Sequence, residues 1–519
     1  MASFWLDGIA MALLEQVLKN ALTVPVYDVA EETPLELAPL LSQKLLNQVW
    51  LKREDLQPVF SFKLRGAYAK MVKLTPAQKA AGVIAASAGN HAQGVALSAK
   101  KMGIKAIIVM PQTTPPIKVN AVKRLGAEVV LHGEAFDEAA VYAKQLMREQ
   151  GLTFIHPYDD EDVIAGQGTI ALEILRQHPT PFDVMFVCVG GGGLIAGIAA
   201  VLKKIWPKTR IVGVEAEDAA SMTQALAAKE RVVLPQVGLF ADGAAVAQVG
   251  EKPFEIALHC VDEMITVTTD EICAAIKDVF EDTRAISEPA GALAVAGLKK
   301  FVQQRGVSNL SLGAIVSGAN MNFDRLHHIA ERTELGEKRE AIFAVKIKEE
   351  PGSFKRFCED LGAQRVITEF NYRYADDQEA LVFVGVRTAG GYAEQQQLVQ
   401  HLRELGYEVE DMSDNELAKL HLRHLVGGRV PGLMDEKVYR FEFPERPGAL
   451  LNFLSRMSVE WNISLFHYRN HSDAFGRVLV GVQVPDQHHA DFEAYLDCLK
   501  YPYTSEQDNP GYRLFLSSK

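Results

Sequence analysis

Between about residues 47 and 325, short runs of β-branched apolar residues alternate with longer segments whose apolar residues recur at helical spacing. The short runs are bounded by Gly, Pro or acidic residues, as strands usually are. They occupy residues 49–55, 82–87, 105–111, 127–133, 153–158, 182–190, 210–217 and 313–320. The alternation predicts an α/β fold with parallel sheets flanked by helices, in which binding loops gather at the carboxyl ends of the strands.

The composition narrows the class of partner. Across 519 residues, 54 Lys and Arg stand against 66 Asp and Glu, which gives a net charge of −12 and a pI near 5.7. Nucleic-acid backbones and anionic membranes both favour basic surfaces, so we expect a small molecule or a protein as the main partner instead. The length suggests about three domains.

Cysteine use and hydropathy indicate the compartment. Five scattered cysteines, with no CxxC pair and no His at metal-ligand spacing, favour a reducing, cytoplasmic setting and no bound metal. The N-terminal stretch is read as an amphipathic helix rather than a signal peptide, because Asp7 and Glu15 interrupt it. The one apolar run of membrane length, residues 184–202, contains four consecutive glycines, so we expect no transmembrane segment.

The C-terminal third repeats itself. A charged stretch predicts a boundary near residues 333–340, and beyond it Pro351-Gly352 can be laid over Pro447-Gly448. The offset of 447 − 351 = 96 then holds for further pairs, among them Phe370 with Phe466 and Val384 with Val480. Each copy is interpreted as a strand, a turn, a helix and two more strands, which together make a small α+β unit.

We therefore predict four parts: an α/β region over 1–335, an α+β unit over 341–413, a connecting helix and linker over 414–435, and a second α+β unit over 436–508. Asp414 is expected to cap the connecting helix and Gly427 to end it. The two copies either serve assembly alone or create related interfaces where a small regulatory ligand binds. The periodicity does not choose between these alternatives.

A glycine loop follows one predicted strand and precedes a helix, in the sequence CVGGGGLIAG at 188–197. Its residues let several backbone amides approach an anion, most naturally a phosphate, at a helix N-terminus. They are Gly190, Gly191, Gly192, Gly193 and Leu194. No Lys-Ser or Lys-Thr follows them, so this is not a Walker loop, and no acidic residue supports a dinucleotide fingerprint. The weaker alternative is a permissive strand-to-helix turn.

Lys63 in SFKLRGA is a second candidate. We expect it in the first turn of a helix capped by Ser61, where the positive end of the helix dipole disfavours a lysine. The same field would lower the pKa of the amine and free it for Schiff-base chemistry. Taken alone, however, a solvated surface lysine is the better explanation of this residue.

Polar groups also follow two other predicted strands. Ser87, Gly89, Asn90 and His91 of SAGNHAQG offer donors to a carboxylate, although a capped helix explains them equally well. Ser317 of IVSGAN is the first polar residue after its strand, and alone it is better explained as a cap.

The motifs SFKLRGA, SAGNHAQG, GGGGL, SEPAGAL and SGAN occur in an order that resembles the fold type II pyridoxal-phosphate enzymes. With its duplicated tail, the chain is similar over nearly its whole length to the biosynthetic threonine ammonia-lyase family. The two repeats resemble the ACT-like regulatory units of that family.

The resemblance implies roles for the candidate residues. Lys63 would carry pyridoxal 5'-phosphate as a Schiff base, and the loop 190–194 would hold its phosphate. Asn90 would hydrogen-bond the pyridoxal hydroxyl, Ser317 would face the ring nitrogen, and the loop from Ser87 to His91 would receive the substrate carboxylate.

Other matching residues stay without a role at this stage. Residues 241–246 and Glu288 of SEPAGAL match further stretches of the family. Glu288 and Pro289 also suit a helix N-terminus. Glu215 and Asp218 could hold a cation, although acidic residues at a strand exit are usually solvated.

The residues favour elimination over transamination. A neutral hydroxyl at Ser317 would not keep the ring nitrogen protonated as a carboxylate would, so rapid loss of a β-leaving group suits the site. The resemblance thus implies that L-threonine loses water, with Lys63 as the base, to give 2-oxobutanoate and ammonia in isoleucine biosynthesis. L-Serine would be a poorer substrate, because one methyl adds only about 1–3 kcal/mol of discrimination.

The resemblance also implies a homotetramer that isoleucine inhibits, with valine opposing the inhibition. Phe354 and Leu450 follow the two Pro-Gly turns at equivalent places and are candidate effector-pocket residues, although core packing explains them better. A serine-directed lyase or racemase, a non-catalytic amino-acid sensor and a ligand-free structural oligomer are the alternatives. The duplicated tail opposes the first, the intact Lys63 and Asn90 oppose the second, and the glycine loop opposes the third.

Overall fold

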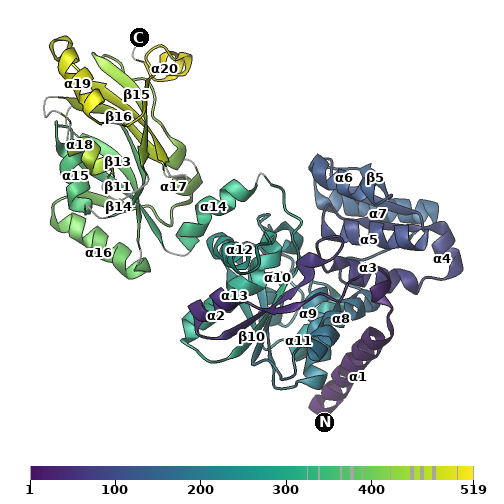
Figure 1. Cartoon of the computed structure of the whole chain (residues 1–519). Helices are drawn as coiled ribbons and strands as arrows, with labels where there is room; N and C mark the ends of the chain where they lie inside the picture. The colour runs from purple at the N-terminus through teal and green to yellow at the C-terminus, as the bar shows by residue number, and fades with distance from the viewer. Residues whose placement is uncertain are drawn as a thin grey trace. The chain divides into compact units, whose positions relative to one another are not determined.

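The computed structural model divides into two compact units, Met1–Thr333 and Glu334–Lys519, which are described separately below (Figure 1). It describes residues 2–323, 325–336, 339–362, 365–374, 379–388, 390–420, 422–444, 449–455, 457, 461–469, 475–499 and 501–517. In the described part of the chain, no helix is long and apolar enough to cross a membrane.

The larger sheet of the first unit has six strands in the order β1-β2-β10-β7-β8-β9. Their bounds are Leu35–Leu37, Gln48–Arg53, Ser311–Val316, Val184–Cys188, Arg210–Ala216 and Glu263–Val267. Only β1 runs antiparallel to its neighbour. Sequence analysis missed β1, which is only three residues long, and β9, whose residues are mostly half-buried and carry no clear apolar run.

The smaller sheet of the first unit is wholly parallel, with the order β5-β4-β3-β6. Its strands span Glu128–Leu131, Ala106–Met110, Val83–Ala86 and Thr153–Phe154. The last of these ends well before Tyr158, so the predicted strand over 153–158 is too long. Both sheets confirm the predicted α/β class.

Helices pack around these two sheets, and the last of them begins in the first unit and ends in the second. They are α1 (Ala2–Thr23), α2 (Pro39–Leu45), α3 (Lys63–Val72), α4 (Pro76–Ala81), α5 (Asn90–Met102), α6 (Pro116–Arg124), α7 (Phe136–Gln150), α8 (Glu161–Gln177), α9 (Gly193–Ile205), α10 (Ser221–Ala228), α11 (Glu251–Cys260), α12 (Thr269–Thr283), α13 (Pro289–Arg305) and α14 (Arg325–Gly336). The central pair α3 and α8 approaches closely, since a Cβ added to Gly166 would lie 2.7 Å from the Cα of Gly66. Small residues at this crossing therefore fix the position of α3, the helix that begins with Lys63.

The second unit is one antiparallel sheet of eight strands, ordered β14-β11-β13-β12-β16-β17-β15-β18. The first repeat contains β11 (Glu340–Lys348), α15 (Ser353–Leu361), β12 (Ile367–Arg373), β13 (Glu379–Arg387), α16 (Gly391–Glu404) and β14 (Glu408–Asp411). The second contains β15 (Glu436–Pro444), α18 (Ala449–Ser455), β16 (Asn462–Arg469), β17 (Phe475–Gln483), α19 (His489–Leu499) and β18 (Tyr503–Ser505), and α20 (Pro510–Phe515) follows it. Each copy thus adds a helix and a strand to the predicted order.

Equivalent strands join the two repeats. In the pairing of β12 with β16, Phe370 lies opposite Tyr468, Asn371 opposite His467, and Tyr372 opposite Phe466. Asn371 and His467 are equivalent by the 96-residue offset, and the pairs on either side exchange the equivalents Phe370/Phe466 and Tyr372/Tyr468, so a local two-fold axis passes between Asn371 and His467. The repeats therefore form one continuous sheet with a shared core.

The connection between the repeats differs from its prediction. The expected helix is split into α17 (Glu416–Leu420) and a 3-10 turn, Leu422–His424. The side chain of Asn415, not of Asp414, accepts a hydrogen bond from the amide of Ala418 at 3.0 Å. The turn at Pro351-Gly352 is present before α15, whereas Pro447-Gly448 lies outside the described residues.

Candidate functional site

The start of α3 lies beside the end of β10. The amide of Phe62 donates to the carbonyl of Ser317 at 3.3 Å, and Ser61 forms an isolated bridge with Gly318. The predicted cap is wrong, because Phe62 is the N-cap residue and the buried hydroxyl of Ser61 contacts no polar partner in the described chain. These backbone contacts place Lys63 next to Ser317.

Lys63 is a partly buried cation without an ion pair. Its Nζ donates to the carbonyl of Pro157 at 3.3 Å, and among the described residues it forms no ion pair with a carboxylate. Burial lowers the pKa of Lys63 to about 8, although negative charge at Cys188 and Glu288 opposes the shift. A useful fraction of free amine therefore exists near neutral pH, as Schiff-base and proton-transfer chemistry require.

The glycine loop joins β7 to α9 and is formed by close contacts. A Cβ on Gly191 would lie 2.3 Å from the ring of Tyr158, and one on Gly190 would lie 2.9 Å from the Cα of Ala244. Ala244 belongs to the segment 241–246, so this segment forms one side of the loop. Within the described chain, the amides of Gly190, Gly191 and Gly192 donate to no protein acceptor. Unused donors at a helix N-terminus fit a phosphate group.

Asn90, the first residue of α5, is held at both ends of its amide. Its Nδ2 donates to Oε1 of Glu288 at 2.6 Å, and its Oδ1 accepts from Nδ2 of Asn320 at 2.8 Å. Burial raises the pKa of Glu288 to about 7, with a further contribution from Asp242. Sequence analysis gave Glu288 no role, and the structure makes it the partner that orients Asn90.

At the start of α5, the amides of Asn90 and His91 donate to no acceptor within the described chain. Gly89 is the N-cap residue and no side chain caps the helix, while the Oγ of Ser87 accepts from the amide of Gly89 at 3.2 Å. The imidazole of His91 instead contacts the carbonyl of Ile155 at 2.8 Å. Burial lowers the pKa of His91 to about 3, so its ring stays neutral and only its amide can serve a carboxylate.

The whole chain is similar to known proteins. A family described as pyridoxal-phosphate dependent enzyme matches residues 26–318, and the C-terminal regulatory domain of threonine dehydratase matches 331–422 and 427–516. A biosynthetic L-threonine dehydratase of Burkholderia multivorans is 56% identical over 505 residues, covering 96% of this chain and 99% of that protein. The Escherichia coli protein of the same name is 52% identical over 502 residues, covering 97% of each.

The chain belongs to the biosynthetic threonine dehydratases.

Solved structures agree for the catalytic part of this family. A threonine deaminase isoform of Solanum lycopersicum is 51% identical with a TM-score of 0.61, covering 62% of this chain and 93% of that one. A maize serine racemase is 31% identical with a TM-score of 0.57, covering 61% of this chain and 95% of that one. The predicted family and the pyridoxal-phosphate cofactor are thereby confirmed.

The residues present fit this cofactor of the threonine dehydratases. The unused amides of the glycine loop suit its phosphate, and the amine of Lys63 suits its aldehyde. Ser317 is buried at the end of β10, where its hydroxyl donates to the carbonyl of Ala290 at 3.3 Å. A hydroxyl can rotate to another acceptor, so Ser317 could serve a ring nitrogen.

Glu215, which sequence analysis considered as a cation ligand, holds a helix instead. Its Oε1 accepts from the amide of Met222 at 2.8 Å, and its Oε2 accepts from the amide of Thr223 at 2.8 Å and from its hydroxyl at 2.6 Å. These donors belong to the first turn of α10, whose positive end favours a carboxylate.

The two candidate effector residues lie in the core of the second unit. The ring of Phe354 is buried, with its centroid 4.6 Å from that of Tyr372 and 6.5 Å from that of Phe466 in the other repeat. Leu450 is partly buried and packs against the same core. The helices that carry them, α15 and α18, contact each other.

Proposed function

We propose that this chain deaminates L-threonine to 2-oxobutanoate and ammonia as a step of isoleucine biosynthesis. The observation that carries the proposal is the partly buried, ion-pair-free Lys63 beside a loop of unused amides. Both features cost stability in a protein without a ligand, and both suit a phosphorylated aldehyde. The proposal is also supported by relatives that are named L-threonine dehydratase and that match this chain over almost their full length.

Bound pyridoxal phosphate supplies a sink for the electron pair that remains when the substrate's α-proton leaves. Lys63, with its lowered pKa, is a base that can take this proton and hold it at Nζ. The carbonyl of Pro157 accepts a hydrogen bond from the same atom and limits its movement. Lys63 is thus both the anchoring and the proton-transferring group.

The remaining residues orient the reactants. Amides of the loop from Ser87 to His91 receive the substrate carboxylate at the uncapped start of α5. Asn90, fixed by Glu288, presents its amide to the cofactor hydroxyl. Ser317, a neutral group, leaves the ring nitrogen without a carboxylate partner, which favours loss of the β-hydroxyl over a long-lived carbanion.

The tail is proposed to regulate this reaction. Isoleucine binding near Phe354 and Leu450 would inhibit the enzyme, valine would oppose it, and the working assembly would be a homotetramer. The support is the matched regulatory domain and the shared core that joins the two repeats across the local two-fold axis. L-Serine is proposed as a poorer substrate, because only a methyl group separates it from threonine.

The test is production of 2-oxobutanoate from L-threonine by the purified protein supplied with cofactor, with and without L-isoleucine, and of pyruvate from L-serine. Turnover that isoleucine suppresses supports both parts of the proposal. Turnover that isoleucine does not change would contradict the regulatory part of the proposal. Activity on L-serine without activity on L-threonine would show that serine, and not threonine, is the substrate.

A further inference from the structure

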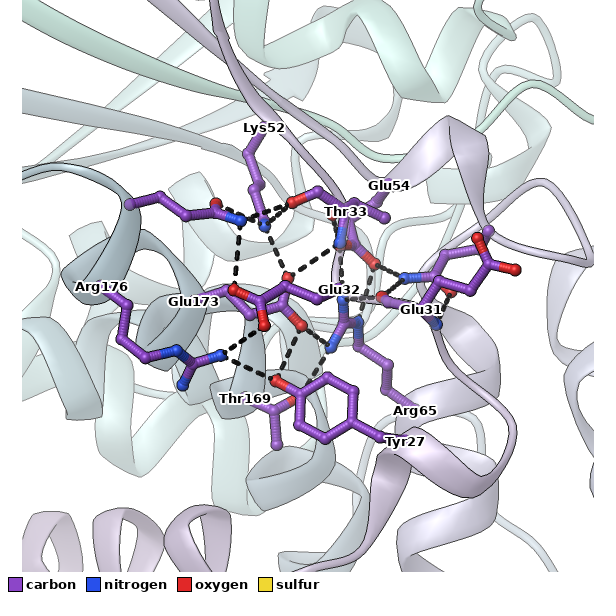
Figure 2. Close-up of polar contacts among 12 residues, drawn as sticks. Tyr27, Glu31, Glu32, Thr33, Lys52, Glu54, Arg65, Thr169, Glu173 and Arg176 are labelled. Atoms are coloured by element: carbon purple, nitrogen blue, oxygen red, sulfur yellow. Dashed lines mark hydrogen bonds and ion pairs between the residues drawn. The ribbon is translucent and has the colours of Figure 1, made fainter.

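Four buried charged side chains form a cluster that includes Arg65 of α3. Lys52, Glu54, Arg65 and Glu173 are all fully buried, and their two positive and two negative charges balance (Figure 2). None of the four contacts Lys63 through a hydrogen bond. The cluster is therefore separate from the reacting groups described above.

Arg65 is the centre of this cluster. Its Nε and Nη2 donate to the two carboxylate oxygens of Glu54, each at 2.8 Å, which is the bidentate geometry that only arginine provides. Its Nη1 donates to Oε1 of Glu173 at 2.6 Å and to the hydroxyl of Thr169 at 3.1 Å. Nη2 also donates to the carbonyl of Glu31 at 3.1 Å.

The contacts of Arg65 join four segments that are distant in the sequence. Arg65 belongs to α3, Glu54 follows β2, Thr169 and Glu173 belong to α8, and Glu31 lies in the N-terminal segment. Figure 2 shows these side chains converging on the guanidinium from different sides. Lys52 joins the cluster through Glu173, since its Nζ donates to Oε2 of Glu173 at 2.5 Å.

Such a cluster is a poor source of stability. Burying ion pairs costs desolvation energy, and apolar side chains of similar volume often stabilise a fold as well or better. A fully hydrogen-bonded arginine does fix geometry, however, because each donor has one permitted direction. The first turn of α3 needs such a support, since no side chain caps it.

We propose that Arg65 is a positioning residue, which fixes the first turn of α3 so that the amine of Lys63, two residues before it, meets the bound cofactor and substrate at reacting distance. The inference rests on the proposed function, because it takes Lys63 to be the reacting amine. Lysine has four rotatable bonds, so its Nζ is placed only if its Cα is fixed. A misplacement of about 1 Å can reduce a rate about a hundredfold.

Arg65→Lys is the direct test. It keeps the charge but loses the planar fork that binds both oxygens of Glu54 while it also reaches Glu173. We expect kcat per cofactor-loaded subunit to fall about tenfold to a hundredfold, with KM for threonine changed less than about threefold. The pH at which kcat is half-maximal should shift, because Lys63 then lies in a different environment.

Two further variants keep the test decisive. Glu54→Gln removes one arm of the bidentate pair while preserving side-chain shape, so it should lower kcat in the same direction and by less. Arg332→Lys is the matched control, since Arg332 is also buried and pairs with Asp270 at 2.6 Å but belongs to α14. It should leave kcat unchanged.

The holoenzyme variants are compared at a temperature where each remains folded, and attachment of pyridoxal phosphate at Lys63 is measured by borohydride trapping and peptide mass spectrometry across pH. A lower kcat in loaded Arg65→Lys or Glu54→Gln, together with a shifted pH dependence of trapping, supports the inference. If the folded, loaded variants keep wild-type kcat and trapping and lose only thermal stability, the inference is wrong. If the wild type does not turn over threonine at all, the proposed function fails, and the trapping profile still tests the placement of Lys63.

Discussion

Two places in this chain, the glycine loop with Lys63 in the catalytic unit and the two glutamate clusters of the tail, differ in how their polar groups are paired. In the catalytic unit, the glycine-loop amides and Lys63 have no strong protein partner within the described residues. In the tail, two closely packed glycines adjoin polar groups that are fully paired: a Cβ on Gly385 would lie 2.5 Å from Oγ1 of Thr368, and one on Gly481 would lie 2.8 Å from Oγ of Ser464. In these two places, the unpaired groups mark where a ligand fits, while the paired groups hold the architecture.

The two tail clusters are themselves related by the 96-residue offset. Thr368 donates to Glu340 at 2.5 Å, and Ser464 donates to Glu436 at 2.6 Å at the equivalent position. Their cations differ, however. Arg423 of the connection pairs with Glu340, whereas Arg373 of the first repeat crosses to Glu436 of the second. The two repeats thus share the carboxylates but not the cations. Arg373 links the first repeat to the second, and Arg423 links the connection to the first repeat.

Replacement of Lys63 should give the largest effect. In Lys63→Ala, deamination should fall by at least about a thousandfold, because both proton transfer and attachment of the cofactor are lost. Thermal stability should not fall, since an unpaired, partly buried cation stabilises little. Kinetics of 2-oxobutanoate formation and thermal melts measure the two effects. Lys70→Ala, which removes a cation paired with Asp160 and Asp162, is the control that should keep activity. Full activity in the Lys63 variant would contradict the assignment.

Replacement of Arg373 should lower stability and leave activity nearly unchanged, which is the reverse of the effect expected for Lys63. Arg373→Ala leaves the buried carboxylate of Glu436 with Ser464 and Tyr512 as its remaining partners among the described side chains, so the tail should lose about 3–5 kcal/mol of stability. Turnover of threonine without effector should stay within about twofold of wild type, as the tail holds none of the reacting groups. Urea denaturation followed by circular dichroism, with kinetics in parallel, checks this. The exposed Lys346, paired with Glu408 and Glu379, provides the control Lys346→Ala, which should leave the denaturation curve unchanged. An Arg373 variant as stable as the wild type would show that this buried ion pair does not hold the architecture of the tail.

Glu288 should make the catalytic unit less stable at higher pH. Its pKa is about 7 in the folded chain against an ordinary value of 4.5, so its favourable contribution is complete below pH 4.5 and is lost as pH rises through 7. Glu288→Gln cannot ionise, so between pH 4.5 and 8 the wild type should lose about 3 kcal/mol relative to this variant. Urea denaturation at both pH values measures the difference. An equal difference at the two values would show that Glu288 does not ionise in this range.

How far the sequence predicted this molecule depends on the range of the interactions. The glycine loop and Lys63 were recognisable because their neighbours in sequence carry the signal. The partnership of Glu288 with Asn90 spans 198 residues and could not be predicted from local patterns. For the same reason the cap at Ser61 was wrong, since the chain there pairs with Ser317 and Gly318 after β10 and no side chain caps the helix. In the tail, the offset predicted two units, but only strand pairing reveals that they share one sheet.

The smallest predicted effect is a loss of cofactor affinity when a methyl group is added to the glycine loop. In Gly191→Ala the new methyl would lie 2.3 Å from the ring of Tyr158, so either the ring or the loop must move. Such overpacking costs about 1–3 kcal/mol, and each 1.4 kcal/mol weakens binding about tenfold, so pyridoxal phosphate should bind about tenfold or more weakly. Titration of the cofactor-depleted protein measures this affinity. Gly428→Ala in the tail is the matched control, because no atom lies within 4 Å of its added Cβ. Unchanged cofactor affinity in the Gly191 variant would mean that this loop does not hold the phosphate of the cofactor. Its unused amides would then need a different ligand, and the difference between them and the paired groups of the tail would need a different explanation.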